Sequence, residues 1–305
     1  MNISDLICLL TIAEERSISK AAKKLFMAQS SLSQSLQEIE SELGSRLFVR
    51  TSTGVRLTPA GEQMIAYAEH ALVDYRQVRN QIQDMEELKA GKVEFGVSTF
   101  RGSYLIPKVL RLFKKKYPNI QVEITEANSM ELEQHLIAGQ IDLALIVLPL
   151  MKLKSDVKVW LKDEVCLAVS SDHPVLEYAQ ETEKNGKKYH YVDLEDAVEF
   201  EYVLSGYDTV LGNMARNEFK KREIKPKVYN ANLTAFFAAS MARSGLGMAF
   251  TYASCKENYE DVTYLSIGRE GIYLDLALAF PPDGYRSKAA RALEACFLSS
   301  EFLKE

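Results

Sequence analysis

Residues Ser17 to Glu40 read SISKAAKKLFMAQSSLSQSLQEIE, and this stretch organises the N-terminal end of the chain. In its second half, apolar residues recur at spacings of four, three and four, which predicts the buried face of a helix ending near Gly44. These residues are Leu32, Leu36, Ile39 and Leu43. The first half adds Ala21, Ala22 and Leu25 to the same contact. The pattern therefore predicts two short helices folded around a turn.

The second of these helices has a polar face opposite its apolar face. Glutamine and serine side chains there are donors and acceptors suited to base edges in a DNA major groove. On the first helix, Lys20 and Lys24 lie where a phosphate backbone can pass. We interpret the pair as a DNA-binding unit; the alternative is an ordinary amphipathic pair with a solvated face. The candidate base contacts are Gln29, Ser30, Ser31, Ser33, Gln34 and Gln37.

The charge distribution supports a local polyanion-binding surface. The formal net charge is −5, which excludes a uniformly basic coat. From Arg16 to Gln37 there are four basic residues and no acid, and from Leu43 to Thr58 there are three arginines and no acid. Residues 1–61 carry seven basic and six acidic side chains, a net +1, which leaves −6 for the rest. The N-terminal end is therefore the predicted nucleic-acid-binding end.

The segment LFVRTSTGVRLT, residues 47–58, has two short apolar-polar alternations around a Ser-Thr-Gly turn. It predicts a small hairpin, or wing. A helix start follows at Thr58 and Pro59, because threonine caps helices and proline suits their first turn. The candidate phosphate contacts of the wing are Arg50, Thr53 and Arg56.

The helix that follows carries a heptad pattern of apolar residues over about three repeats. A helix of about 30 residues spans roughly 45 Å, too long to pack wholly on a domain of 60 residues. We therefore predict a dimerisation helix; the alternative is that the seam packs within its own chain. Ala90 and Gly91 are predicted to end the helix and form a hinge. The seam consists of Met64, Ala68, Ala71, Tyr75, Val78, Ile82 and Met85.

From Lys92 onward the period changes to strands alternating with helices. Such alternation predicts a parallel sheet flanked by helices, and the pattern restarts at the strand VCLAVS. The last strand, IYLDLALAF, and a helix over residues 285–302 are predicted to return to the first lobe. The lysine- and glutamate-rich residues 177–188 are predicted to form an exposed loop insertion.

The sequence lacks the motifs that mark enzymes, metal-binding proteins and membrane proteins. There is no GxSxG, HExxH or Walker motif, and no histidine has a metal-ligand spacing, so we expect no catalytic residue, metal or cofactor. The first apolar run does not resemble a signal peptide, and no window is apolar enough for a membrane helix. Four dispersed cysteines without CxxC indicate free thiols in a reducing cytoplasm.

Together these residues resemble the LysR-type transcriptional regulators. The likeness in residues 1–89 is carried by Ser17, Ala21, Ala22, Leu25, Gln29, Leu32, Ser33, Ile39, Glu40, Leu43, Gly44, Leu47, Phe48, Arg50, Leu57, Thr58, Ala60 and Gly61. It continues through Gly96, Val97, Phe113, Tyr117, Pro118, Gly139, Asp142, His173, Pro174, Gly245 and Gly247. Ala28 and Gln34 depart from the serine or threonine and the arginine common in the family. These two departures leave the base preference of the second helix open.

The resemblance implies an α/β protein with an all-α winged helix-turn-helix domain at residues 1–58, a long linker helix and hinge at 59–91, and an effector domain at 92–305. That domain is expected to have two lobes like periplasmic solute-binding proteins, one about 92–164 with 267–305 and the other about 165–266. Family likeness further implies double-stranded promoter DNA as partner, dimers assembled as tetramers, and RNA polymerase as a partner of an activator.

The resemblance also implies a small effector bound between the lobes. The predicted lining residues lie at strand ends before helix starts, where free N–H groups favour an anion. The alternative is that their hydroxyl and amide groups only cap helices. The candidate effector residues are Ser98, Thr99, Phe100, Asn128, Ser129, Leu148, Ser205 and Asn230.

Two other functions fit part of the sequence. A small-molecule-binding protein would need only the α/β half, but the basic, acid-free wing argues against it. A redox sensor of the same family would need a cysteine pair near Leu204 and Ser205, and no cysteine stands there. We therefore predict a cytoplasmic, DNA-binding regulator without a membrane partner.

Overall fold

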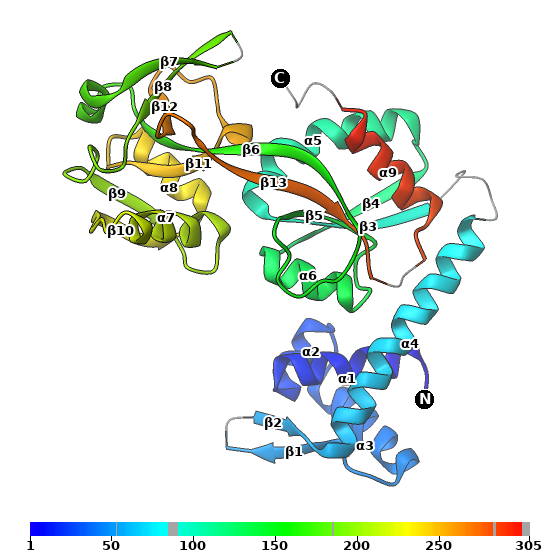
Figure 1. Ribbon diagram of the computed structural model, residues 1–305. Coiled ribbons are helices and arrows are strands. Elements are labelled where there is room, and N and C mark those ends of the chain that lie inside the picture. Colours follow the sequence, from blue (N-terminus) through cyan, green and yellow to red (C-terminus); the bar gives the residue numbers. More distant parts are fainter. Residues whose placement is uncertain (53, 85–90, 185, 283–284, 301–305) are drawn as a thin grey trace. The chain divides into compact units, whose positions relative to one another are not determined.

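The computed structural model describes residues 1–52, 54–84, 91–184, 186–282 and 285–300. The chain forms two compact units that divide between Gln83 and Asp84 (Figure 1). The N-terminal unit contains the predicted helix pair and wing, and the C-terminal unit contains the α/β part. Each unit is described on its own below.

The N-terminal unit follows the predicted order of helices and hairpin. Its elements are α1 (Ile3–Glu15), α2 (Ile18–Lys24), α3 (Gln29–Leu43), β1 (Phe48–Thr51), β2 (Gly54–Leu57) and α4 (Pro59–Asp84). Its core includes Leu9, Ile12, Leu32 and Leu47, which are at most 2% exposed. The apolar faces of α1, α2 and α3 thus form one core, as the spacing predicts.

Local capping sets the ends of these helices. The Ser17 side chain accepts a hydrogen bond from the Lys20 N–H, and α3 ends at Gly44 in the left-handed conformation at φ 65°. Thr58 Oγ1 accepts a hydrogen bond from the Gly61 N–H at 3.0 Å, which confirms the predicted start of α4. Ala28 caps α3 without any side-chain hydrogen bond. The helix end at Gly44 and the Thr58 cap were predicted from the sequence, whereas the Ser17 cap was not.

The wing is the predicted antiparallel hairpin, with Phe48 opposite Leu57 and Thr51 opposite Gly54. Gly54 has φ 138°, and a Cβ atom there would lie 2.2 Å from the Arg16 carbonyl oxygen. That oxygen accepts a hydrogen bond from the Val55 N–H at 2.9 Å. Only glycine allows the backbone to approach this closely, so Gly54 makes possible the hydrogen bond that joins the wing to the end of α1. Thr53 lies outside the described residues.

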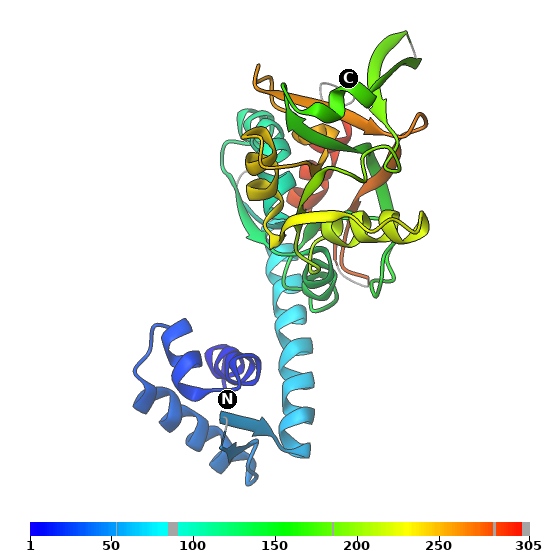
Figure 2. The same ribbon diagram turned by 90° about the vertical axis from the view of Figure 1, so that its left-hand side faces the viewer.

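The structure corrects the first half of the predicted dimer seam. Met64 and Ala68 are buried in the core of the N-terminal unit, and Ala71 packs against it. Their heptad spacing therefore serves packing within the chain. Tyr75, Val78 and Ile82, further along α4, are exposed. Figure 2 shows α4, in cyan, continuing past the three blue helices of its unit. Met85 lies outside the described residues, as does Ala90 of the predicted hinge.

The C-terminal unit is built on one mixed sheet with the strand order β4-β3-β5-β13-β6-β12-β8-β7, in which β11 also pairs with β6. The strands β3, β4 and β5 are parallel, whereas β13 runs antiparallel to both β5 and β6. The predicted parallel sheet is therefore confirmed for β3, β4 and β5, and β13 joins it in the antiparallel direction. The final strand does return to the first lobe, as predicted.

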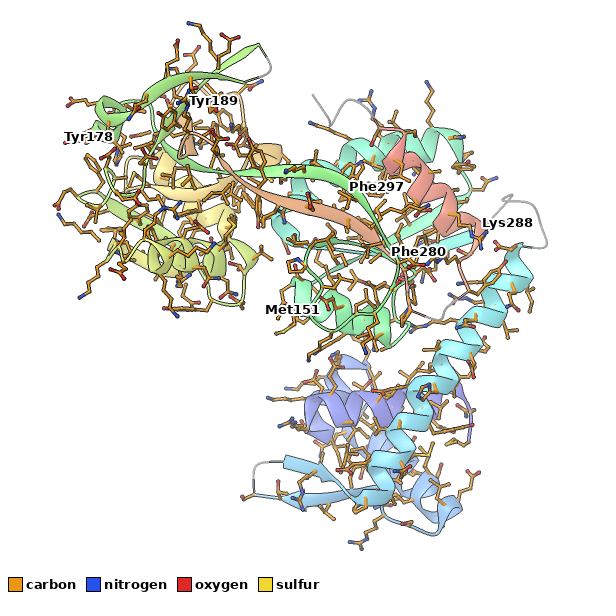
Figure 3. All side chains as sticks on the ribbon, in the orientation of Figure 1. Met151, Tyr178, Tyr189, Phe280, Lys288 and Phe297 are labelled. Atoms are coloured by element: carbon orange, nitrogen blue, oxygen red, sulfur yellow. The ribbon has the colours of Figure 1, made fainter. Side chains whose placement is uncertain are left out.

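The first lobe contains β3 (Gly91–Val97), α5 (Thr99–Lys116), β4 (Ile120–Glu126), α6 (Ser129–Ile137), β5 (Leu143–Val147) and α9 (Lys288–Leu298). Gly91 is the first residue of β3, paired with Ile120, and so is not part of a helix end. The core of this lobe joins α5 and α9 to the sheet and includes Phe280 and Phe297 (Figure 3).

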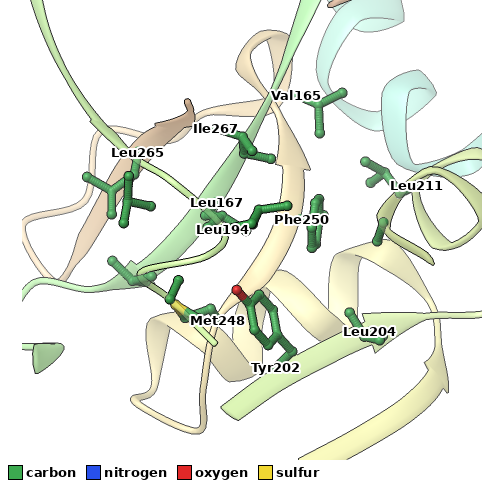
Figure 4. Close-up of a cluster of buried hydrophobic side chains, with 14 of the residues drawn as sticks. Val165, Leu167, Leu194, Tyr202, Leu204, Leu211, Met248, Phe250, Leu265 and Ile267 are labelled. Atoms are coloured by element: carbon green, nitrogen blue, oxygen red, sulfur yellow. The ribbon is translucent and has the colours of Figure 1, made fainter. Parts of the chain in front are cut away.

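The second lobe contains β7 (Gln180–Lys184), β8 (Lys187–Val192), β9 (Glu201–Ser205), α7 (Val210–Lys221), β10 (Lys227–Leu233), α8 (Ala235–Arg243), β11 (Ala249–Tyr252) and β12 (Val262–Ile267). Its core surrounds Tyr202 and Phe250, whose ring centroids are 6.2 Å apart (Figure 4). The strands β9 and β10 form a separate parallel pair.

Two long strands pass between the lobes: β6 (Val157–Ser170) and β13 (Ile272–Ala279). Val165 of β6 packs in the second core and Trp160 of the same strand in the first. Likewise, Leu274 packs against the second core and Leu276 lies in the first. The two lobes are therefore joined by continuous sheet.

The predicted loop insertion at residues 177–188 is wrong for most of its length. The strands β7 and β8 pair antiparallel, with Gln180 opposite Tyr191 and Thr182 opposite Tyr189. The lysine- and glutamate-rich composition led to the loop prediction, but charged side chains are also common in strands at a sheet edge, where this hairpin lies.

Candidate functional site

The polar face of α3 is open to solvent in the N-terminal unit. Gln29, Ser30, Ser31, Gln34 and Gln37 are exposed, and Ser33 is half-buried. The Gln34 side-chain nitrogen donates a hydrogen bond to Glu38 Oε1 at 3.0 Å. The structure thus brings the predicted residues together on one helix, and Glu38 engages one of the two N–H donors of the Gln34 amide.

The predicted cations are not equivalent. Lys20 is exposed, whereas the Lys24 ammonium lies 3.0 Å from Glu14 and 3.1 Å from Glu15. Hydrogen bonds to Glu14 and Glu15 raise the pKa of Lys24. Its charge is therefore partly neutralised by α1, which sequence spacing alone did not reveal.

The wing places its arginines on different faces. Arg50 pairs with Val55 and Arg56 with Val49 in the hairpin register. Because successive residues of a strand point to opposite faces, Arg50 and Arg56 lie on opposite faces of the wing. Both are exposed.

Sequence reasoning matched Glu40 to a family pattern but gave it no role. Its Oε1 accepts hydrogen bonds from the N–H groups of Leu47 at 2.7 Å and Phe48 at 3.1 Å. These two residues lead into β1, so one carboxylate of α3 holds the base of the wing. An acid in the last turn of a helix, where the macrodipole disfavours it, was the available signal.

The remaining part of the predicted seam is an apolar stripe. Tyr75, Val78 and Ile82 are 50%, 53% and 59% exposed. Their spacings of three and four residues place them on one side of α4.

In the C-terminal unit, a cleft of about 680 Å³ has walls from both lobes. Ser98, Thr99, Phe100, Asn128 and Ser129 line it, as predicted. An adjoining hollow of about 720 Å³ shares Asn128 and Ser129 and includes Leu148. Six of the predicted effector residues therefore lie together.

The prediction that Ser205 and Asn230 line the effector cleft is wrong, since neither is among the residues that line the cleft or the adjoining hollow. Ser205 is 4% exposed at the end of β9, and its carbonyl oxygen accepts a hydrogen bond from Arg216 at 2.7 Å. Asn230 lies on the exposed strand β10. The lining from this lobe comes instead from the next segments along the chain, around Asp208 and Thr234.

The cleft is formed by the starts of α5, α6, α7 and α8. Asn128 caps α6, Thr209 caps α7 and Thr234 caps α8, each by accepting a backbone N–H. The Ser98 side chain before α5 makes no such bond. Asn128 therefore caps a helix and also lines the cleft, whereas Ser98 lines the cleft without a capping hydrogen bond. Helix N-termini carry partial positive charge, which favours an anion in the cleft.

Arg101, Asp208 and Phe236 also line the cleft and were not predicted. The Arg101 side chain is 2% exposed, and its Nε lies 3.4 Å from Asp163. Its guanidinium carbon lies 3.4 Å from the centre of the Tyr252 ring. No sequence pattern singled out Arg101, because its partners Asp163 and Tyr252 come from distant strands.

Two of the four free cysteines, Cys166 and Cys255, are deeply buried. Burial raises the pKa values of Cys166 and Cys255 to about 12, so both are protonated near neutral pH. Among the described residues, no cluster of histidine, cysteine and acidic side chains fits a metal ion. None of the described helices is long and apolar enough to span a membrane.

The sequence matches two domain families. Residues 3–62 match the bacterial regulatory helix-turn-helix protein, lysR family, and residues 86–300 match the LysR substrate binding domain.

The similar proteins carry the names of transcriptional regulators. A probable RuBisCO transcriptional regulator of a Nostoc species is 30% identical over 92% of this chain and 83% of its own length. The uncharacterized HTH-type transcriptional regulator YcgK of Bacillus subtilis is 29% identical over 96% and 92%.

Two solved structures have the same fold. A full-length OxyR cysteine-to-aspartate variant from Pseudomonas aeruginosa aligns with a TM-score of 0.68 and 21% identity over 98% of both chains. Full-length CbnR in a complex with its target DNA aligns with a TM-score of 0.66 and 18% identity over 97% and 99%.

Proposed function

We propose, because this chain belongs to the LysR family of bacterial transcriptional regulators, that α3 and the wing bind promoter DNA under the control of an effector in the cleft. The exposed polar face of α3 carries this proposal. A helix with such a face fits a major groove, while the wing can meet the flanking backbone. The protein acts in the cytoplasm, where bacterial promoters lie, and has no catalytic step.

Gln29 is the sharpest candidate for base recognition. It is exposed at the first position of α3, and N-terminal residues of a recognition helix are those that contact base edges. Gln37 lies two turns later. Gln34 contributes through the second N–H and the oxygen of its amide, while Glu38 holds the first N–H. Lys20, Arg50 and Arg56 hold phosphates, and Lys24 does so less because Glu14 and Glu15 share its charge.

Self-association follows from the stripe on α4. Tyr75, Val78 and Ile82 expose apolar surface on one side of a helix, which a second copy of α4 can cover. Two α3 helices in a dimer then meet successive major grooves of a palindromic site. A dimer of dimers is the proposed DNA-bound form, and RNA polymerase is the further partner where binding activates transcription. CbnR, which has the same fold, is known in a complex with its target DNA.

The test begins with selection of bound DNA fragments by the purified full chain, followed by affinity measurements on the selected site and on random DNA. Gln29→Ala should cost about 1–3 kcal/mol on the selected site and little on random DNA. Gln121→Ala, an exposed glutamine of the C-terminal unit, is the control. Equal loss on both DNAs would make Gln29 a positioning contact.

Salt dependence tests the phosphate contacts separately. Affinity should fall about a thousandfold between roughly 50 and 200 mM salt if six to ten phosphates are neutralised. Arg56→Ala should lower the slope of log affinity against log salt by about 1. A salt-insensitive complex would rule out the proposed backbone contacts.

A further inference from the structure

A second cavity of the C-terminal unit has no part in the proposed function. Its volume is about 140 Å³, and its walls come from α5, α8, β11, β12 and the segment between the last two. Among the described residues, it shares only Phe100 and Phe236 with the lining of the effector cleft. Phe236 and Tyr259 are 59% and 49% exposed and form its rim, whereas Ala168 and Cys255 are buried and form its floor. The cavity is therefore reached from solvent past the two exposed rings.

Five of the lining side chains are aromatic. Aromatic ring faces carry partial negative charge and attract cations within about 6 Å of the ring centre. The chain itself shows this attraction, because the Arg243 guanidinium carbon lies 4.5 Å from the centre of the Tyr259 ring. The cavity therefore suits a positively charged group that also has apolar surface. The aromatic residues are Phe100, Tyr104, Phe236, Tyr259 and Tyr264.

Two of these tyrosines hold Glu257 in the wall. The Tyr264 hydroxyl accepts a hydrogen bond from the Glu257 N–H at 3.1 Å, and the Tyr104 hydroxyl is hydrogen-bonded to the Glu257 side chain. Burial and the charge of Glu257 raise the pKa of Tyr104, so this hydroxyl keeps its proton. A fixed carboxylate thus stands among the aromatic rings, and we call the cavity the Glu257 pocket.

The cation in the wall, Arg243, neutralises Glu257 only in part. Its Nη1 lies 4.0 Å from the Glu257 carboxylate, beyond hydrogen-bond distance, and its Nε lies 3.5 Å from Asp261. One guanidinium thus serves two carboxylates, which leaves negative charge beside the rings. Lys256 is exposed and is not among the lining residues. A cationic ligand therefore gains attraction here, and an anionic ligand does not.

The size and the wall of the pocket limit the ligand further. A volume of about 140 Å³ is smaller than the roughly 300–1,000 Å³ of sites for drug-sized ligands, so the pocket takes a small group. A primary ammonium group has three N–H donors to satisfy, and a wall of aromatic rings offers few acceptors. A trimethylammonium group has no N–H, and its methyl groups can pack on ring faces.

We infer that the Glu257 pocket binds the trimethylammonium group of a small organic cation, as a second ligand site beside the effector cleft. This site goes beyond the proposed function, because it depends neither on DNA binding nor on an effector in the cleft. The aromatic rings hold the methyl groups, and Glu257 supplies the opposite charge. Glu257 is therefore the residue that distinguishes a cation from a neutral molecule of the same shape.

The probes are choline, its uncharged analogue 3,3-dimethylbutan-1-ol, and ethanolamine, which has a primary ammonium group; each is titrated calorimetrically into the full-length chain. Choline should bind, and the other two should bind at least about tenfold more weakly. Absence of choline binding at about 10 mM would overturn the site. An alcohol that binds as tightly as choline would overturn the cationic class, and equally tight ethanolamine would overturn the trimethylammonium group.

Glu257→Gln keeps the size of the side chain and removes its charge. It should weaken choline binding about tenfold and leave binding of 3,3-dimethylbutan-1-ol unchanged, whereas a merely structural role would weaken both equally. Glu260→Gln is the matched control, because Glu260 is an exposed acid of the same segment that does not line the pocket.

Tyr259→Leu tests the rings if Glu257→Gln does not fold, since Tyr259 is half exposed. It should weaken choline binding about threefold to thirtyfold, and Tyr259→Phe should keep most of the affinity. Choline binding that is unchanged in Tyr259→Leu would overturn the aromatic contact.

Two tryptophan substitutions locate the ligand. Ser240→Trp fills the Glu257 pocket and should abolish choline binding, whereas Ser129→Trp fills the effector cleft and should leave it unchanged. Choline binding that persists in Ser240→Trp would overturn the pocket as its site. Loss of binding in Ser129→Trp alone would place the cation in the cleft, which would overturn this inference and leave the proposed function standing.

Discussion

Removal of the Glu40 carboxylate should loosen the wing from the recognition helix. Glu40 Oε1 is the acceptor for the N–H groups of Leu47 and Phe48, at 2.7 and 3.1 Å. Leu47 and Phe48 are 2% and 7% exposed, so water cannot easily replace that acceptor. In Glu40→Ala both N–H groups lose their partner.

The magnitude follows from those two groups. A buried N–H left without an acceptor costs about 1–3 kcal/mol, and partial hydration next to half-buried Glu40 keeps the sum near 2–4 kcal/mol. Such a loss corresponds to about 30-fold to 1,000-fold in the opening equilibrium. Glu40→Gln keeps a neutral acceptor at the same place and should lose about 1 kcal/mol.

Hydrogen exchange followed by mass spectrometry measures this in the full chain. Peptides that cover the end of α3 and the wing should exchange faster by that factor in Glu40→Ala, and DNA affinity should fall because Arg50 and Arg56 lose their fixed positions. Glu38→Ala is the control for hydrogen exchange, since Glu38 is exposed and its side chain accepts a hydrogen bond from Gln34 and not from the wing. Gln121→Ala is the control for DNA affinity, because Gln121 is exposed in the C-terminal unit. Exchange in Glu40→Ala within about threefold of the wild type would refute the reasoning.

Two substitutions and one labelling experiment test other parts of the molecule. Ile82→Glu should weaken self-association by about tenfold or more, measured by sedimentation, because a charge then enters the apolar stripe; unchanged association would remove this stripe from the interface. Glu133→Ala takes the acceptor from the N–H groups of residues 151–153, so the melting temperature of the C-terminal unit should fall by roughly 6–12 °C. Burial raises the pKa values of Cys166 and Cys255 to about 12, so both thiols stay protonated at pH 8. Iodoacetamide should therefore alkylate them at pH 8 about a thousandfold more slowly in the folded protein than in the unfolded chain. Comparable alkylation rates in the two states would show that the thiols are accessible.

The N-terminal unit was largely predictable because its signals are local. The apolar spacing along α3, the Ser17 and Thr58 caps and the glycine of the wing each act within a few residues. The failures there concern partners from other elements. Met64 and Ala68 have the spacing of a dimer seam, but α1 to α3 already cover them.

The cleft was predictable only in part. Asn128 with Glu131 is a local capping pair, and both residues stand where the sequence placed them. The assignment of Ser205 and Asn230 to the cleft lining was wrong, because family likeness indicates which segments lie near the cleft but not which of their residues face it. The prediction of a loop at residues 177–188 was wrong because the strands β7 and β8 have no apolar alternation, and they pair at the edge of the sheet.

The sequence by itself determined the helices of the N-terminal unit, their caps, the wing and the alternation of strands and helices, since these depend on neighbours a few residues away. Only the tertiary structure decided which faces remain free and what each polar group meets. Arg101 illustrates the difference: Asp163 lies 62 residues further along the chain, and Ser254 a further 91. Packing of α5 against β6 and β11 turns an ordinary first-turn arginine into a buried donor, because burial and charge pairing depend on distance in space.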